Sequence, residues 1–188
     1  MAGIKIKIQK RVLIIFFVII AVSFSVVIFF MSYKPYEPIT AVNYYGKIIN
    51  FRVDLRKADG IPVYPSDSAL YLELMHPLVQ NITIAVKPVN GTENAYYGIE
   101  AFEITKLLYG YARIGTKPGF NAINVSSYEH LPGKIQNPII ALVHPVYSDE
   151  TAIRIENHVI FIKAKNYEEF DLATVKFLIV ALGIELEG

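Results

Sequence analysis

Residues 12–30 read VLIIFFVIIAVSFSVVIFF, and this stretch decides how the chain is organised. No charged residue or proline lies between Val12 and Tyr33, and within residues 12–30 only one alanine and two serines depart from Val, Leu, Ile and Phe. A helix over these 22 residues would be about 33 Å long, enough to cross a hydrocarbon core of roughly 30 Å. The sequence therefore predicts a single transmembrane helix over residues 12–33.

The charges beside this helix predict its orientation. Residues 1–11 contain four basic residues and no acidic one, whereas Lys34 and Glu37 follow the span. Lysine and arginine are retained on the cytoplasmic side of a membrane. We therefore expect a cytoplasmic basic segment over residues 1–11, and a cell-membrane protein whose C-terminal domain lies outside.

Two alternatives to an uncleaved anchor share the basic start and the apolar run. A cleaved secretory signal has an apolar core of about 7–15 residues before a small-x-small site. Here the core is longer, and the one suitable tripeptide, at residues 21–23, lies in mid-span. Pilins show a glycine or alanine directly after the basic segment, where this chain has Arg11-Val12. We favour the uncleaved anchor, with the cleaved signal and a pilin-like assembly subunit as alternatives.

Composition restricts the possible partners and cofactors of the remaining chain. The chain has 18 basic and 17 acidic residues, and beyond residue 11 the balance is 14 against 17, a net charge of −3. A mildly acidic domain without a basic stripe argues against a nucleic-acid partner. The absence of cysteine excludes disulfides, thiol chemistry and cysteine metal sites. We expect no cofactor, and membrane, envelope proteins or glycans as partners.

Three N-x-[ST] sequons agree with an external location. They begin at Asn81, Asn90 and Asn124, and glycosylation takes place only on the outer side at exposed positions. Because Ile82, Ile84 and Val86 alternate with polar or small residues, we expect a half-buried strand there. Such a strand would place Asn81 and Thr83 together on its outer face.

The pattern beyond the span predicts a short stalk over residues 34–46 and one compact α/β domain over residues 47–188. Strands are indicated near residues 49–55, 81–86, 120–126, 139–143, 151–155 and 158–163, with a tight turn at Glu156-Asn157. Residues 61–80 fit either a short helix capped by Ser66 or Ser68 and ending before Pro77, or a strand. Strands alternating with at least two helices favour a mixed β-sheet.

Two helices are indicated clearly. After Gly98, apolar residues recur on one stripe as far as Ile114, and Gly115 is a suitable end. Asn166 lies three residues before Glu169, which is typical of a helix start, and Gly183 is a suitable end for the second helix. Residues 170–182 of this second helix are apolar on nearly every face, which predicts a buried core helix.

His144 is the best catalytic candidate because it directly follows the predicted buried strand at residues 139–143. Open α/β sheets place their sites at the carboxyl ends of strands, and Asp149 and Glu150 lie in the same connection. None of the four histidines has a partner at metal-ligand spacing, so we predict no metal site. A structural histidine beside Pro145, with solvated acids nearby, is the alternative.

Other catalytic motifs are absent. Ser126, Ser127, Glu129 and His130 are residue types found in hydrolases, but the chain has no G-x-S-x-G nucleophile turn. It also has no phosphate-binding or dinucleotide-binding glycine motif. All thirteen tyrosines lie at or beyond Tyr33, and amphipathic aromatics are typical of binding surfaces and of half-buried sheets.

Residues 137–183 resemble the α/β unit of archaeal surface-layer proteins. The similarity lies in a strand opening with Asn-Pro (NPIIALV), a second strand (HVIFIKA), and a helix carrying Asp171-Leu172-Ala173-Thr174. It covers about a quarter of the chain. The glycine-rich turn of that unit is replaced here by His144-Pro145.

These observations favour a membrane-anchored extracytoplasmic domain that binds or scaffolds, in the cell envelope or as an accessory subunit of a membrane complex. The alternatives are a membrane-tethered hydrolase or metal enzyme using His144 with Asp149 or Glu150, and a pilin-like subunit. The absence of catalytic spacing favours binding over catalysis.

Overall fold

The computed structural model describes residues 40–89, 93–111 and 118–186, and residues 38–188 form one compact unit. The predicted cytoplasmic segment, the predicted span, residues 34–39 of the stalk, Asn90 and Gly115 lie outside the described residues. Within the described ranges, no helix is long and apolar enough to cross a membrane.

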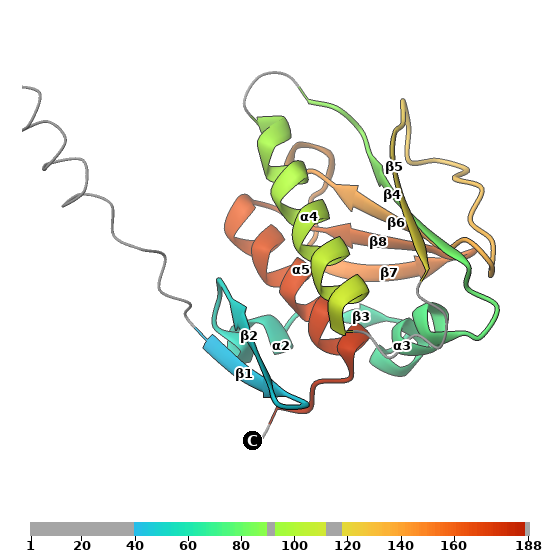
Figure 1. Ribbon diagram of the computed structural model, residues 1–188. Coiled ribbons are helices and arrows are strands. Elements are labelled where there is room, and N and C mark those ends of the chain that lie inside the picture. Colours follow the sequence, from blue (N-terminus) through green and yellow to red (C-terminus); the bar gives the residue numbers. More distant parts are fainter. Residues whose placement is uncertain (1–39, 90–92, 112–117, 187–188) are drawn as a thin grey trace, which may run out of the picture. The chain divides into compact units, whose positions relative to one another are not determined.

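The domain is an α/β fold built on a six-stranded mixed sheet, as the sequence predicts (Figure 1). The strands lie in the order β3-β7-β8-β6-β4-β5. Only β7 and β8 run antiparallel, and the other neighbouring pairs are parallel. The strands are β3 (Val63–Tyr64), β4 (Asn81–Val86), β5 (Gly119–Asn124), β6 (Ile139–Val143), β7 (Ala152–Glu156) and β8 (Val159–Lys163).

Four α-helices and one separate hairpin complete the described fold. The helices are α2 (Leu55–Asp59), α3 (Asp67–Met75), α4 (Asn94–Tyr111) and α5 (Tyr167–Leu182), and a 3₁₀ turn, η2 (Pro145–Tyr147), follows β6. The hairpin pairs β1 (Thr40–Tyr44) with β2 (Lys47–Phe51).

The two faces of the sheet are covered differently. The main apolar core lies between the helices and one face of the sheet, and α4 and α5 lie side by side over that face (Figure 1). A smaller apolar cluster lies on the opposite face, beneath side chains of the segment at residues 125–131. This second face therefore carries no helix among the described residues.

Helix α5 confirms the prediction of a buried core helix. The Asn166 side chain accepts a hydrogen bond from the Glu169 N–H at 2.9 Å, and Gly183 ends the helix in the left-handed conformation at φ 65°. Eleven of its residues are buried, including Lys176. The Lys176 ammonium lies 2.7 Å from Asp59 and 2.8 Å from Asp67. The one charged side chain that is buried in this helix therefore forms two ion pairs.

The strands at the centre of the sheet are confirmed, but the exposure expected for Thr83 on β4 is wrong. All five residues of β6 are buried, as the unbroken apolar run predicts. β4 lies between β5 and β6, and Thr83 is buried with its hydroxyl donating to Asn137 Oδ1 at 3.0 Å. Asn81 is exposed, so the two sequon residues differ in exposure, and the buried Thr83 hydroxyl has Asn137, in the segment before β6, as its partner.

The start of the domain also differs from the expectation. Residues 40–46, which we assigned to the stalk, form β1 and the turn of the hairpin. Tyr44 is buried and its hydroxyl donates to the Leu182 carbonyl at 2.7 Å. Leu55 begins α2 rather than ending a strand, because Asp54 caps a helix there.

Residues 61–80 take the helical alternative, since Ser66 caps α3. Helix α4 begins at Asn94, more than one turn before the start expected after Gly98. The predicted β7–β8 hairpin is confirmed, but its turn lies at Asn157-His158, one residue later than expected, because Glu156 still pairs with Val159 and both turn residues have positive φ.

Arg52, which follows β2, contacts three carboxyl groups from two helices. Its Nη2 lies 2.5 Å from Glu100, 2.7 Å from Glu103 and 3.9 Å from Asp171. Glu100 is fully buried, and its second oxygen has no hydrogen-bond partner within the described part of the chain. Burial and the neighbouring Asp171 raise the pKa of Glu100 to about 8, against the opposite effect of Arg52.

The first prediction concerns the pH dependence of stability. Because folded Glu100 keeps a proton that the unfolded chain releases near pH 4.5, its contribution to stability is present below that pH and is lost as pH rises toward 8. Within this window the free energy of unfolding should fall by at most about 1.4 kcal/mol per pH unit. Glu100→Gln should remove this loss, measured by urea unfolding at pH 5, 6.5 and 8. Glu103→Gln, beside the same arginine, should retain it, and parallel profiles for wild type and Glu100→Gln would contradict the assignment.

Candidate functional site

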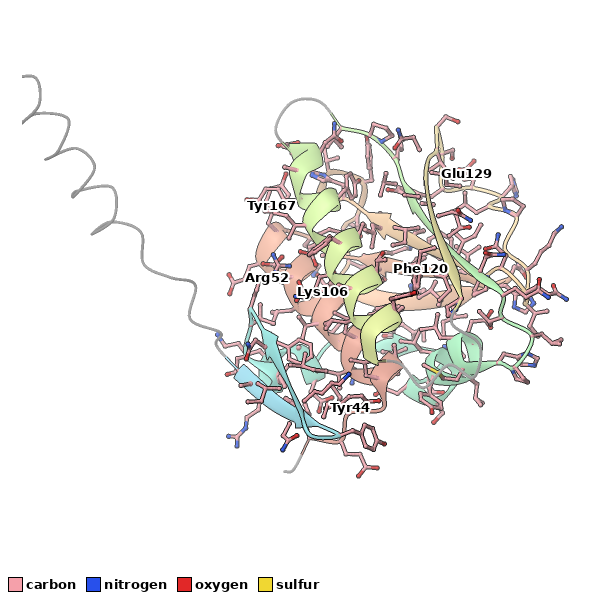
Figure 2. The ribbon with its side chains drawn as sticks, viewed as in Figure 1. Tyr44, Arg52, Lys106, Phe120, Glu129 and Tyr167 are labelled. Atoms are coloured by element: carbon pink, nitrogen blue, oxygen red, sulfur yellow. The ribbon has the colours of Figure 1, made fainter. Side chains whose placement is uncertain are left out.

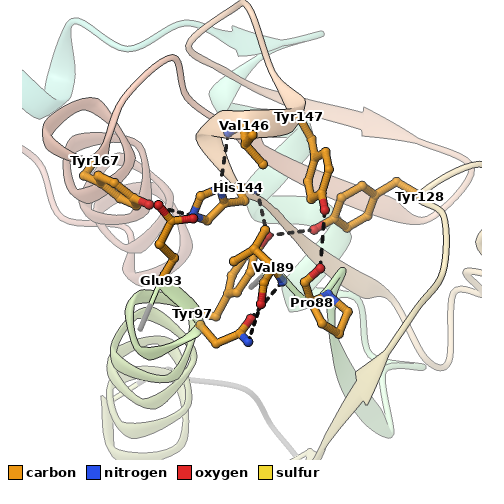
Figure 3. Close-up of polar contacts among 10 residues, drawn as sticks. Pro88, Val89, Glu93, Tyr97, Tyr128, His144, Val146, Tyr147 and Tyr167 are labelled. Carbon is orange, nitrogen blue, oxygen red and sulfur yellow. Dashed lines mark hydrogen bonds and ion pairs between the residues drawn. The ribbon is translucent and has the colours of Figure 1, made fainter. Parts of the chain in front are cut away.

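His144 directly follows β6, at the end of the sheet where the carboxyl ends of β4, β6 and β8 meet, as the sequence predicts. Figure 3 shows four tyrosines gathered around this edge, each from a different part of the chain. Tyr97 comes from α4, Tyr128 from the segment after β5, Tyr147 from η2 and Tyr167 from the start of α5. The tertiary structure therefore forms an aromatic cluster here that no local sequence motif predicts.

The backbone N–H and both ring nitrogens of His144 have hydrogen-bond partners. Its Nδ1 accepts from the Val146 N–H at 3.2 Å, and its backbone N–H donates to the Tyr97 hydroxyl at 3.1 Å. Because Nδ1 is an acceptor, the neutral ring carries its proton on Nε2, which lies 2.9 Å from the Tyr167 hydroxyl. Burial lowers the pKa of His144, against the effect of Glu93 4.0 Å away. His144 is therefore a buried neutral ring with both nitrogens engaged.

Tyr97 and Tyr128 extend this network between the strands. The Tyr128 hydroxyl donates to the Leu142 carbonyl, accepts from the Lys87 N–H at 2.9 Å and lies 3.4 Å from the Tyr97 hydroxyl. Burial raises the pKa of both phenols, so both stay protonated at physiological pH. They satisfy backbone groups at the ends of β4 and β6 and are not suited to act as bases.

The structure does not bring together the catalytic group considered from the sequence. Glu150 accepts hydrogen bonds from Arg154 at 2.8 and 2.9 Å and from Lys163 at 3.1 Å, and these partners lower its pKa to about 2. Glu93, which sequence spacing did not indicate, is the carboxylate that faces His144. Within the described ranges, no group of three or more His, Asp or Glu side chains could hold a metal ion.

A pocket of about 960 Å³ adjoins the cluster on the helix-free face of the sheet. Its floor is formed by side chains of β6 and β8, one wall by the segment 127–131, and its ends by η2 and by the β7–β8 turn. The lining residues are Lys87, Ser127, Tyr128, Glu129, His130, Leu131, Val143, Tyr147, Glu156, Asn157, Val159, Phe161 and Lys163.

The pocket combines aromatic rings with charges of both signs. Tyr147 and Phe161 each have a lysine near the ring, with Lys87 4.2 Å and Lys163 5.8 Å from the respective ring centres. Two glutamates balance the two lysines. A lining of this kind offers ring faces, ammonium donors and carboxylate acceptors without an excess charge, which suits a neutral, hydroxyl-rich ligand.

The remaining candidates from the sequence lie in different places. Glu129 and His130 line the pocket, and the Glu129 N–H donates to Ser127 Oγ at 3.1 Å in a local turn. The sequons at Asn81 and Asn124 start on exposed residues at opposite ends of their strands, β4 and β5. The pocket as a whole has no sequence signature, because its residues come from five separated segments.

Comparison of the chain with protein-family models, with curated proteins and with solved structures finds no significant match. Function is therefore inferred from the residues of the site itself.

The second prediction separates a structural from a catalytic role for His144. His144→Asn keeps a side-chain oxygen for the Val146 N–H but loses the Tyr167 bond and the ring packing against Tyr97. We expect it to lower the free energy of unfolding by about 1–3 kcal/mol, measured by urea denaturation. His130→Asn is the matched control, since His130 is exposed and asparagine tolerates its positive φ, and it should change stability by less than about 0.5 kcal/mol. An unchanged stability for His144→Asn would contradict the structural role.

Proposed function

We propose that the protein is a single-pass, membrane-anchored extracytoplasmic domain that binds a glycan of the cell envelope in the pocket on the helix-free face of its sheet. The observation that carries this proposal is the pocket itself, with its aromatic rings and balanced charges. A scaffolding role in the envelope follows from tethering such a binding domain to the membrane.

The chemistry of the pocket supports a saccharide over other small ligands. Sugar rings present apolar C–H faces that pack on aromatic side chains, and hydroxyls that pair with ammonium and carboxylate groups. Phe161 and Tyr147 supply the rings, and Lys87, Glu129 and Glu156 supply polar groups around them. An anionic ligand would meet the two glutamates, and a wholly apolar ligand would desolvate four charged side chains.

The anchor and orientation in this proposal come from the sequence. They are supported by the uncharged run over residues 12–33 and by the excess of basic residues before it. The sequons at Asn81 and Asn124 begin on exposed residues of the domain, which is compatible with an external location.

Hydrolysis has less support than binding. The His144 ring is occupied by Val146 and Tyr167, and Glu150 is occupied by Arg154 and Lys163. A general base needs a free lone pair within reach of a substrate proton.

The third prediction tests the membrane orientation by labelling single introduced cysteines. The chain has no cysteine of its own, so each label reports one position. A membrane-impermeant maleimide should label Leu72→Cys in intact cells, since Leu72 is 65% exposed on α3. Gly3→Cys should be labelled only after the cells are opened. The reverse pattern would overturn the orientation, and with it the envelope role.

The fourth prediction tests the pocket. The probe is the delipidated glycan fraction of the host envelope, and the protein is full length in nanodiscs. Tyr147→Ala and Phe161→Ala should each weaken binding by at least about tenfold, measured by biolayer interferometry, because each removes a ring from the pocket. Tyr71→Ala is the matched control, as Tyr71 and Tyr147 are both 40% exposed but Tyr71 lies on α3.

Binding that survives both pocket substitutions, or no binding to the glycan fraction at all, would contradict the proposal. Binding of an envelope protein instead of the glycan, lost in the same two variants, would mean that the pocket is a binding site but that its ligand is not a glycan.

A further inference from the structure

Helix α4 has apolar side chains on two opposite sides. On the inner side Tyr97, Ile104 and Leu108 are buried in the core. On the outer side Ile99, Phe102 and Tyr109 are 46%, 67% and 53% exposed. Large apolar side chains gathered on the outer side of a helix are typical of a contact surface for a partner.

The outer side of α4 has the spacing of a helix-docking seam. Ile99, Phe102, Lys106 and Tyr109 follow one another at intervals of three, four and three residues. This is the spacing that keeps side chains in line with the axis of a second packed helix. Lys106 is exposed on α4 (Figure 2).

The seam is also symmetric about Ile104. Ile99 and Tyr109 lie at equal distances on either side of it, as do Phe102 and Lys106, and as do Gly98 and Gly110. When two copies of one helix pack antiparallel about a two-fold axis, residues at equal distances on either side of the centre oppose each other. An antiparallel α4 pair would therefore set every seam residue against a different, complementary one.

We propose that the outer side of α4 is the surface through which the protein pairs with a second copy of itself, in an antiparallel arrangement centred beside Ile104. The Lys106 ammonium of each copy lies against the Phe102 ring of the other, a favourable cation–π contact. Ile99 of each copy packs on Tyr109 of the other. The proposal depends on neither the anchor nor the pocket ligand.

The glycines at the two ends of the seam fit this arrangement. A Cβ atom added at Gly98 or Gly110 would meet nothing within 4 Å, so open space lies beside the backbone at both positions. Opposed glycines allow the helix ends to approach closely, within the 8–10 Å range of packed helices.

Charge favours a second copy over other occupants of this surface. Lys106 lies in the middle of the seam, between Phe102 and Tyr109. An apolar helix or a lipid surface would desolvate this ammonium without offering it a partner. A second copy offers the Phe102 ring at the required position.

Cysteine cross-linking of the full-length protein in detergent tests both pairing and direction. Two tagged copies are expressed together, one with Ile99→Cys and the other with Tyr109→Cys, and are then oxidised. We expect a disulfide between the two different copies and almost none when either variant is expressed alone, because identical positions lie about 15 Å apart along the antiparallel axis. Linkage of Ile99→Cys to itself would overturn the antiparallel arrangement.

A second measurement uses dimer dissociation followed by mass photometry. Phe102→Lys sets two ammonium groups against each other and should raise the dissociation constant by at least about 30-fold. Leu72→Lys is the matched control, because Leu72 and Phe102 are 65% and 67% exposed on different helices, and it should leave dissociation unchanged. A monomeric wild type, equal effects of the two lysines, or cross-linking of α4 to residues 1–39 would each overturn the proposal.

Discussion

Helix α5 must be covered on nearly every side, because from Phe170 to Leu182 only Asp171, Thr174 and Lys176 are polar. The fold meets this constraint by packing α2, α3 and α4 around it and by placing the sheet beneath it. The two charged residues among the three are paired at the edges of the contact, Lys176 with two aspartates and Asp171 with Arg52. Gathering the helices around α5 on one side leaves the other face of the sheet without a helix among the described residues.

That asymmetry creates the candidate site. Side chains of β6 and β8 that would lie under a helix in a doubly covered sheet instead form the floor of an open pocket. The segment after β5 provides one wall, and Tyr128 connects this wall to the ends of β4 and β6 through hydrogen bonds. The buried network around His144 thus supports the pocket from the side, which explains a fully engaged histidine at the position where open α/β sheets place reactive groups.

The same constraint bears on α4. One side of this helix covers α5 and the sheet. Its other side presents Ile99 and Phe102 to solvent, so the outer surface of the helical layer is apolar there. A second copy would complete the covering of α4 as α4 completes the covering of α5. Pairing through the helical face would leave the pocket on the opposite face of the sheet accessible to its ligand in both copies.

Local patterns determined much of the secondary structure. Asn166 and Gly183 fixed the ends of α5, the unbroken run at residues 139–143 fixed a buried strand, and the residues around Asn157 indicated a hairpin to within one position, because capping, burial and turn chemistry act over a few residues. The sequence could not assign residues 40–46, Thr83 or Glu150 correctly, since their environments depend on Leu182, Asn137 and Lys163. The pocket and the covering of one sheet face likewise came only from the tertiary structure, which alone sets the partners of residues far apart in the chain.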